Sequence, residues 1–129
     1  MKAGRVLAAA VIAAASAQAF GAAGDPKRGE EVYSRCLACH ALAYDRTGPR
    51  HCGLFGRRAG SVAGFAYSEA MRRSKIVWSD ATLDRFIADP LKTVPGTAMG
   101  YAGVKDARER ADLIAYLRAS NRSAECAKR

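Results

Sequence analysis

The sequence predicts an all-α domain in which helices are joined by long loops wrapped around a central group. Three observations carry this prediction. Apolar residues recur at helical spacing in several segments. The stretch from Gly53 to Gly64 is too rich in glycine to read as a strand, and no alternating strand pattern is visible. A length of 129 residues, with no repeat, suits one small domain.

The chain begins with the features of a signal peptide at residues 1–19. Lys2 and Arg5 form a positive n-region, residues 6–15 form an apolar h-region, and Ala-Gln-Ala ends the segment as a cleavage site. We therefore expect the mature chain to start at Phe20, in a periplasmic, oxidising compartment. The alternative is an uncleaved membrane anchor, for which the apolar run is short.

The composition is basic, with a formal charge of +9 that falls to +7 when Lys2 and Arg5 are removed. A basic protein can bind nucleic acid, a membrane surface or an acidic protein. No block of five like charges occurs, and aromatic residues are not interleaved with the basic ones. This pattern argues against a nucleic-acid partner.

The first predicted helix begins at Asp25, because aspartate is a good N-cap and Pro26 suits the first helical position. Val32 and Tyr33 give this helix an apolar side. It runs into the sequence Cys36-Leu37-Ala38-Cys39-His40.

Three further helices are expected. A short one lies around residues 68–74, and Ser79 caps another over residues 80–88, which Asp89-Pro90 closes. The last begins at residues 106–109, which resemble a capping box. The apolar positions at helical spacing are Leu83, Phe86 and Ile87 in the third helix, and Leu113, Ile114 and Leu117 in the last.

The motif C-x-x-C-H at residues 36–40 is typical of covalent haem attachment. Thiols three residues apart lie on one face of a helical turn, so both can reach the vinyl groups along one haem edge. His40 then follows beneath the ring, where its imidazole can bind iron. Two alternatives stay open from these five residues alone: a dithiol redox motif and half of a zinc site.

From about Gly24 to Asn121 the chain resembles a class I cytochrome c of the mitochondrial and purple-bacterial type. Besides C-x-x-C-H, the motifs that carry this resemblance are Thr47-Gly48-Pro49, Gly53-Leu54-Phe55-Gly56-Arg57, Gly64-Phe65-Ala66-Tyr67, Trp78, Pro95-Gly96-Thr97 with Met99, and Asp112-Leu113-Ile114-Ala115-Tyr116-Leu117. The resemblance implies a cytochrome c domain over residues 20–122, with about four helices around one covalent haem c.

A carrier with six-coordinate iron needs a second axial ligand opposite His40, and methionine there raises the reduction potential. Met1 leaves with the signal peptide, and Met71 sits in a short helix, where filling the core is the ordinary role. Met99 follows a Pro-Gly turn and matches the family's ligand. The remaining histidine, His51, is placed by the resemblance on the His40 side, so we expect a packed or surface imidazole.

Further site roles are implied by the resemblance. The carbonyl of Pro49 would accept the free N–H of His40 and so orient the ring. Thr97 would reach one propionate. The residues that match those holding the other, buried propionate are Arg57, Tyr67 and Trp78.

The chain also departs from the family pattern. Phe86 stands where a tyrosine usually bonds near the ligand sulfur, Met71 replaces a polar residue, and His51 replaces an apolar haem contact. Leu91 and Ala98 stand where docking lysines are common. The basic residues that remain as docking candidates are Arg35, Arg46, Lys92 and Lys105.

The implied function is one-electron transfer by a soluble, monomeric carrier without a stable membrane anchor. Its partners would be a donor complex and an acceptor such as an oxidase, docking transiently at the haem edge. Two alternatives remain: a peroxidase-like enzyme if Met99 detaches, and a thiol oxidoreductase if Cys36 and Cys39 are free.

The remaining two cysteines form an even pair in an exported chain, which predicts a disulfide between Cys52 and Cys126. In the resembling fold the end of the last helix returns near the segment after Pro49. The bond would tie down residues 123–129, a tail that otherwise frays. Two free thiols, or an intermolecular bridge through Cys126, are the alternatives.

Overall fold

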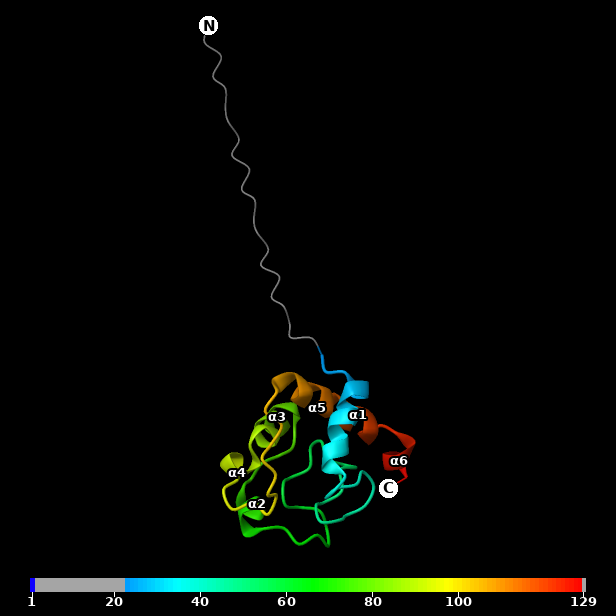
Figure 1. Ribbon diagram of the computed structural model, residues 1–129, viewed down its shortest axis with the longest axis vertical. Coiled ribbons are helices and arrows are strands. Elements are labelled where there is room, and N and C mark those ends of the chain that lie inside the picture. The colour runs from blue at the N-terminus through cyan, green and yellow to red at the C-terminus, as the bar shows by residue number, and fades with distance from the viewer. Residues whose placement is uncertain (2–22, 129) are drawn as a thin grey trace.

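The computed structural model describes residue 1 and residues 23–128, and the regular elements within these residues are helices joined by long loops (Figure 1). The predicted signal peptide at residues 1–19 and the mature start at Phe20 lie outside the described residues, apart from Met1. In chain order the elements are α1 (Pro26–Tyr33), the 3₁₀ helix η1 (Ser34–Cys36), α2 (Glu69–Arg73), α3 (Asp80–Ala88), α4 (Pro90–Thr93), α5 (Ala107–Asn121) and α6 (Ala124–Ala127).

Helix α1 begins where the sequence predicts. The Asp25 side chain accepts hydrogen bonds from the backbone N–H groups of Lys27 and Arg28, at 2.8 and 3.3 Å, and Pro26 occupies the first turn. The helix then tightens into η1, which ends at Cys36. This tightening delivers the first cysteine of the motif at the end of a continuous helical segment.

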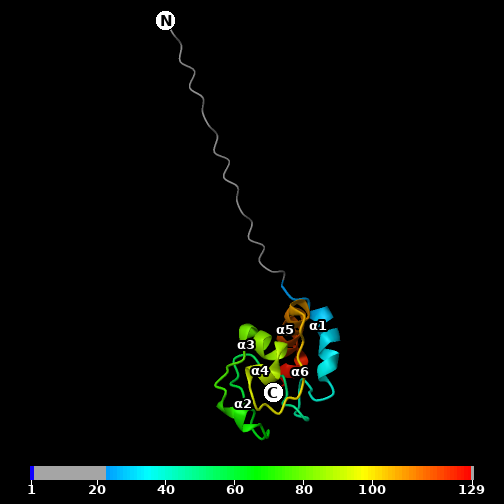
Figure 2. The same ribbon diagram turned by 60° about the vertical axis from the view of Figure 1, so that its left-hand side comes forward.

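The crossing of α1 and α5 forms one side of the domain, and the two helices lie side by side in both views (Figures 1 and 2). Gly29 makes the close approach possible, because a Cβ there would lie 1.9 Å from the carbonyl oxygen of Asp112. Val32 and Tyr33 bury their side chains in the core beside the stripe on α5. The predicted apolar faces are therefore the ones that pack.

A buried carboxylate fastens this crossing. The Asp112 side chain, 4% exposed, accepts hydrogen bonds from the Asp25 backbone N–H at 2.7 Å and from Arg28 Nε at 2.9 Å. These donors, the Arg28 guanidinium first, hold the pKa of the Asp112 carboxyl below its usual range. A buried charge is tolerated here because it is fully hydrogen-bonded.

Helices α3 and α4 differ from the prediction in one respect. Ser79 and Thr82 form a reciprocal capping box at the start of α3, but the Asp89-Pro90 pair does more than close that helix. Asp89 adopts an extended conformation, its side chain accepts from the Lys92 N–H at 3.1 Å, and Pro90 starts α4. One aspartate thus ends one helix and caps the next.

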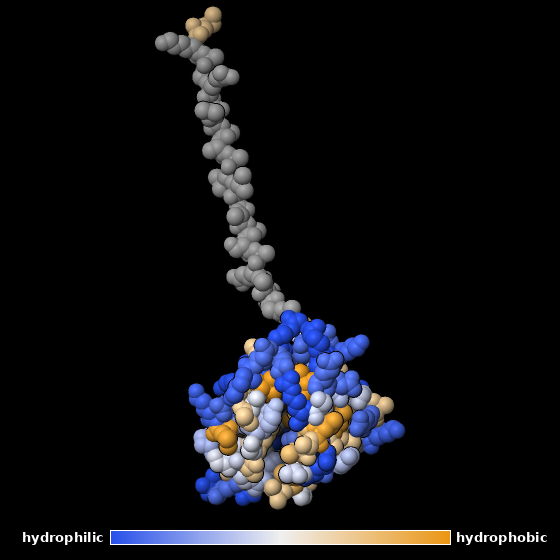
Figure 3. Space-filling model, viewed as in Figure 1, coloured by the Kyte–Doolittle hydropathy of each residue, from blue (hydrophilic) through white to orange (hydrophobic). Residues whose placement is uncertain are grey.

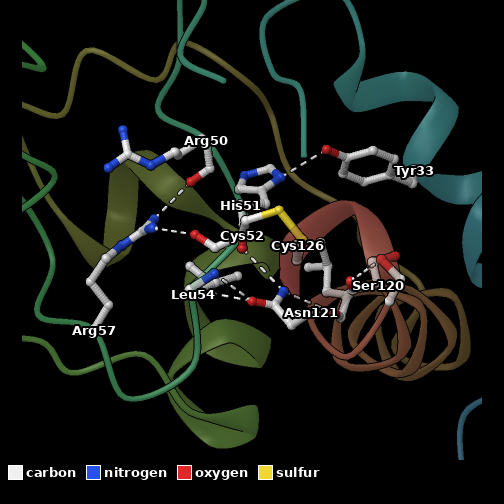
Figure 4. Close-up of a disulfide and its surroundings, with 12 residues drawn as sticks. Tyr33, Arg50, His51, Cys52, Leu54, Arg57, Ser120, Asn121 and Cys126 are labelled. Carbon is white, nitrogen blue, oxygen red and sulfur yellow. Dashed lines mark hydrogen bonds between the residues drawn. A yellow bond between two sulfur atoms is a disulfide. The ribbon is translucent and has the colours of Figure 1, made fainter. Parts of the chain in front are cut away.

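The C-terminal tail is held against the body of the domain (Figure 4). It contains the short helix α6, which the sequence did not predict. The structure joins Cys52 and Cys126 by a disulfide, with their Cα atoms 5.1 Å apart, in the normal range for this bond. Beside it, the Asn121 side chain accepts from the N–H groups of Gly53 and Leu54 and donates to the carbonyl of His51.

Long loops complete the domain. Between residues 23 and 128 the extended pairing is limited to one isolated bridge, Arg58 with Val77. The glycine-rich stretch is irregular, as predicted, and Gly53, Gly56, Gly60 and Gly64 all have positive φ. Within the same described range, no helix has the length and apolar character that crossing a membrane requires.

Candidate functional site

A cavity of about 470 Å³ lies between the loops and the α1–α5 crossing, and its walls are mostly apolar. It is lined by all nine residues that the sequence analysis selected as cofactor contacts: Cys36, Cys39, His40, Pro49, Arg57, Tyr67, Trp78, Thr97 and Met99. These residues lie between positions 36 and 99, about half of the chain, so the fold brings the selected set to one place.

The two thiols sit on a tight turn after α1. The N–H groups of Cys39 and His40 both donate to the Cys36 carbonyl, at 3.1 and 2.8 Å, which keeps the turn helical. Cys36 is half-buried and Cys39 is exposed, and neither takes part in a disulfide. Burial raises the pKa of the Cys36 thiol to about 11, so it is a poor thiolate at neutral pH.

His40 is oriented for metal binding. The residue is 8% exposed, and Nδ1 lies 2.8 Å from the Pro49 carbonyl oxygen, to which its N–H donates. In a neutral imidazole this bond leaves Nε2 as the unprotonated ligand atom. Burial also lowers the pKa of His40, which favours the neutral form. Gly48 permits this position, because a Cβ there would lie 2.3 Å from Cε1 of the ring.

The loop that carries Met99 is built on a turn. The Thr97 N–H donates to the Val94 carbonyl at 3.0 Å, and Gly96 has a φ of 91°, which glycine adopts readily. The Met99 N–H then donates to the Thr97 hydroxyl at 3.2 Å. Met99 is half-buried and lines the cavity from this loop. Met71 also lines the cavity, from α2.

A polar corner of the cavity surrounds Arg57. Its terminal nitrogens donate to the carbonyls of Cys52 and Arg50, at 3.1 and 2.9 Å (Figure 4). Its Nε is buried and has no hydrogen-bond partner among the described residues. Burial lowers the pKa of Arg57, as expected for a cation that lacks a counter-charge. Such an unpaired donor calls for an acceptor that the chain itself does not supply.

The other predicted contacts frame this corner. The Tyr67 hydroxyl accepts from the Val62 N–H at 3.3 Å, and its own O–H remains available to donate. Trp78 is buried, and its ring centroid is 5.1 Å from that of Phe86. A haem fits this environment, because an apolar macrocycle would fill the cavity and a propionate would satisfy the buried Arg57 Nε.

Two residues besides the nine selected contacts also belong to the site. His51 lines the cavity and stacks on His40, with ring centroids 4.3 Å apart and an interplanar angle of 22°. Tyr33 places its hydroxyl 3.0 Å from Nδ1 of His51. Burial lowers the pKa of His51 well below its usual range, so the ring is neutral. Of the two expected roles, a packed or a surface imidazole, His51 has the packed one, with His40 and Tyr33 as its neighbours.

Three of the four docking candidates contact other parts of the chain. Arg35 makes two hydrogen bonds with Glu109, at 2.8 and 2.6 Å. Arg46 donates to the carbonyls of Leu37 and His40, and so braces the C-x-x-C-H turn. Lys105 donates from Nζ to the Ala88 carbonyl at 2.9 Å, and the same Nζ lies 3.7 Å from Oδ2 of Asp89.

The alternatives for the C-x-x-C-H motif find little support. Over residues 23–128, no group of three or more histidine, cysteine, aspartate or glutamate side chains is placed to hold a metal ion, as a zinc site would require. The raised pKa of Cys36 opposes thiol exchange at neutral pH, which depends on a thiolate. Haem attachment is the use of the motif that agrees with the surrounding cavity.

Comparison with known proteins points the same way. The sequence profile of the family "Cytochrome c" matches residues 26–121. The chain is 45% identical over 114 residues to cytochrome c2 of Blastochloris viridis, covering 86% of this chain and 88% of that protein. It is 45% identical over 105 residues to cytochrome c2 of Rhodomicrobium vannielii, covering 79% and 83%. Among solved structures, cytochrome cH from Methylobacterium extorquens matches with a TM-score of 0.72 and 39% identity, covering 74% of this chain and 99% of that one.

Proposed function

The chain belongs to the cytochrome c family, and from this premise we propose how its own residues hold the haem and where it works. As a member of this family it binds haem c covalently and carries single electrons. We propose that Cys36 and Cys39 attach the haem, that His40 and Met99 ligate the iron, and that Arg57 holds a propionate. The observation that carries this assignment is the single cavity lined by all of these side chains.

The bound haem supplies one-electron exchange at its iron. The chain supplies the surroundings: Pro49 fixes the His40 ring through Nδ1, so that Nε2 faces the ligand position. The Thr97 hydroxyl fixes the backbone that presents Met99. Around a bound haem, apolar walls would exclude water and disfavour the additional positive charge of the oxidised state, and a thioether ligand would favour the reduced state, so both would raise the potential.

The unpaired donor of Arg57 supports its role toward a propionate. Its other nitrogens are fixed by the Cys52 and Arg50 carbonyls, so Nε cannot turn to another partner. Tyr67 and Trp78 line the same cavity, and Thr97 lines it beside Met99. We propose that Tyr67 and Trp78 share the buried propionate with Arg57, and that Thr97 serves the second one.

We further propose that residues 1–19 direct export to the periplasm and are removed there. Haem attachment adds each thiol S–H across a vinyl group: a C–S bond forms, the hydrogen ends on the other vinyl carbon, and no oxidant is needed. A Cys52–Cys126 disulfide removes two hydrogens and suits an oxidising compartment. Each of these events therefore leaves its own mark on the mass of the protein.

The intact mass of the exported protein tests this proposal. We expect the mass of residues 20–129 plus one whole haem, less two hydrogens, and we expect acid-acetone extraction to leave the haem on the chain. A Cys36→Ala, Cys39→Ala double variant is the matched control and should lose all haem on extraction. Complete extraction of haem from the parent protein would contradict attachment through these thiols.

The carrier would work by transient docking, as a monomer without a membrane anchor. The face seen in Figure 3 is hydrophilic over its upper part and carries apolar patches between hydrophilic residues over its lower part. A formal charge of +7 after removal of Lys2 and Arg5 favours an acidic partner. Lys92 is exposed and, among the described residues, only its backbone is engaged, by Asp89. We propose that Lys92 contributes most to steering among the four docking candidates, because each of the others has a partner on the chain.

Electron transfer from the reduced protein to oxidase in washed membranes of the source cells tests the docking proposal. The second-order rate constant should fall as salt rises, because exposed charges are screened beyond about 8 Å at physiological ionic strength. At low salt Lys92→Gln should slow the reaction by about two-fold, because it weakens electrostatic steering. Lys27→Gln, in the first turn of α1, changes the net charge equally and should slow it less. A rate constant that does not depend on salt would reject steering.

The chain is proposed to be a carrier and not an enzyme, because His40 and Met99 together would leave no open position for a substrate. The second candidate, a peroxidase-like activity, requires detachment of Met99. The hydrogen bond from the Met99 N–H to Thr97 opposes that movement.

A further inference from the structure

We propose that Tyr33 and His51 are positioning residues that fix the plane of the His40 imidazole. This inference rests on the proposed role of His40 as an iron ligand. Its evidence is geometric: the His51 ring lies nearly parallel to the His40 ring at 4.3 Å, and its Nδ1 is held by Tyr33 at 3.0 Å. Figure 4 shows the hydrogen bond between Tyr33 on α1 and His51 in the segment after Pro49.

The hydrogen bond to Pro49 alone does not prevent the His40 ring from rocking. A hydrogen bond at Nδ1 anchors one edge of the imidazole but permits rocking of the ring about that anchor. A second ring against its face opposes that motion, because tilting would drive the two rings into contact. His51 therefore restricts a motion that Pro49 does not.

His51 can act in this way because it is fixed itself. Its backbone N–H donates to the carbonyls of Ala41 and Leu42, at 3.2 and 3.1 Å, and its carbonyl accepts from Asn121 at 3.1 Å. The next residue, Cys52, is bonded to Cys126. The main chain of His51 is thus held by backbone contacts and by Asn121, and its side chain is held separately by Tyr33.

Tyr33 completes the arrangement. It is 3% exposed, and His51 is the one hydrogen-bond partner of its hydroxyl among the described residues. A buried hydroxyl without a partner is costly, so Tyr33 and His51 require each other. The Tyr116 ring packs against Tyr33 with centroids 5.0 Å apart and keeps its ring in place.

The orientation of an axial imidazole has a direct spectroscopic signature. In a low-spin ferric haem the imidazole plane sets the direction of the magnetic axes, and hence the pattern of paramagnetically shifted haem methyl resonances. Reduction potential also responds to the orientation and basicity of the ligand. A role limited to stability would change neither quantity under conditions where the protein stays folded.

The test uses the haem-loaded protein and the variants Tyr33→Phe, His51→Leu and the double variant. We expect Tyr33→Phe to redistribute the ferric haem methyl shifts, His51→Leu to do so more strongly, and both to move the potential. The double variant should match His51→Leu alone, because Tyr33 acts through His51. Tyr116→Phe, the same change on the neighbouring ring, is the control and should leave the pattern unchanged.

Methyl shifts and potentials of Tyr33→Phe that superimpose on those of the parent would overturn the proposal. This conservative variant decides the question even where His51→Leu does not accumulate. Failure of the proposed ligation is distinguishable, because it would appear in the parent protein before any variant is made, as a ferric spectrum without the low-spin His-Met signature.

Discussion

Replacing Met99 by alanine is expected to remove the sixth iron ligand and produce the largest functional change available in this chain. The potential should fall on the order of a few tenths of a volt, within the ~0.8 V over which axial ligands tune haem. The weak far-red charge-transfer band of the oxidised protein, which reports the methionine–iron bond, should disappear. Small ligands should bind to the opened position, and peroxidase activity should rise.

Met71→Leu is the matched control, because it removes the other methionine sulfur that lines the same cavity. Met71 is buried at 8% exposure on α2, and a leucine of similar volume should be tolerated with little loss of stability. The far-red band and the potential should therefore stay close to those of the parent. Persistence of the band in Met99→Ala, or its loss in Met71→Leu, would reverse the assignment.

Replacing Cys126 by serine is expected to produce the largest loss of stability. The bond to Cys52 closes a loop between residues 74 apart in sequence. In the chain-entropy model, closing a loop of that size is worth roughly 4 kcal/mol. Urea unfolding of the haem-loaded protein, followed by circular dichroism, should show a correspondingly lower free energy of unfolding, and protease should cleave the tail after α5 more readily.

Ala127→Ser, one residue further along α6, changes the same tail without touching the sulfur and should leave stability near that of the parent. Alkylation provides the chemical check. Denatured parent protein should take up no label at Cys52 or Cys126 until reductant is added, and it should remain monomeric. Labelling of both thiols without reductant would show that the bond does not form.

The sequence indicated which residues line the cavity better than it indicated the short helices around it. Cys36, Cys39 and His40 are adjacent in one motif, and Met99 follows a recognisable turn, so local pattern and family resemblance together place them. By contrast, α4 and α6 have four residues each, too short for a helical period to be visible. The sequence signal for α4 was present but misread, since Asp89-Pro90 can begin a helix as well as end one.

Contacts between distant segments were the hardest to foresee. Tyr33 and His51 each read as an ordinary packed side chain, because no spacing rule brings residues of a helix and a loop together. Arg46 was assigned to a docking surface, yet its guanidinium reaches the Leu37 and His40 carbonyls. The partners of a long side chain depend on the folded backbone around it. The sequence therefore showed the positive charge of Arg46 but not the carbonyls to which it donates.

The close approach of Gly29 to Asp112 bears on the order in which the chain folds. During synthesis α1 and the C-x-x-C-H motif leave the ribosome many residues before α5 does, so the first helix has nothing against which to bury Val32 and Tyr33. Contacts of such high sequence separation form late, since the ends of a long loop must first meet. The nascent chain therefore exposes both attachment cysteines while it is still open, and completion of the last long helix closes the domain over them.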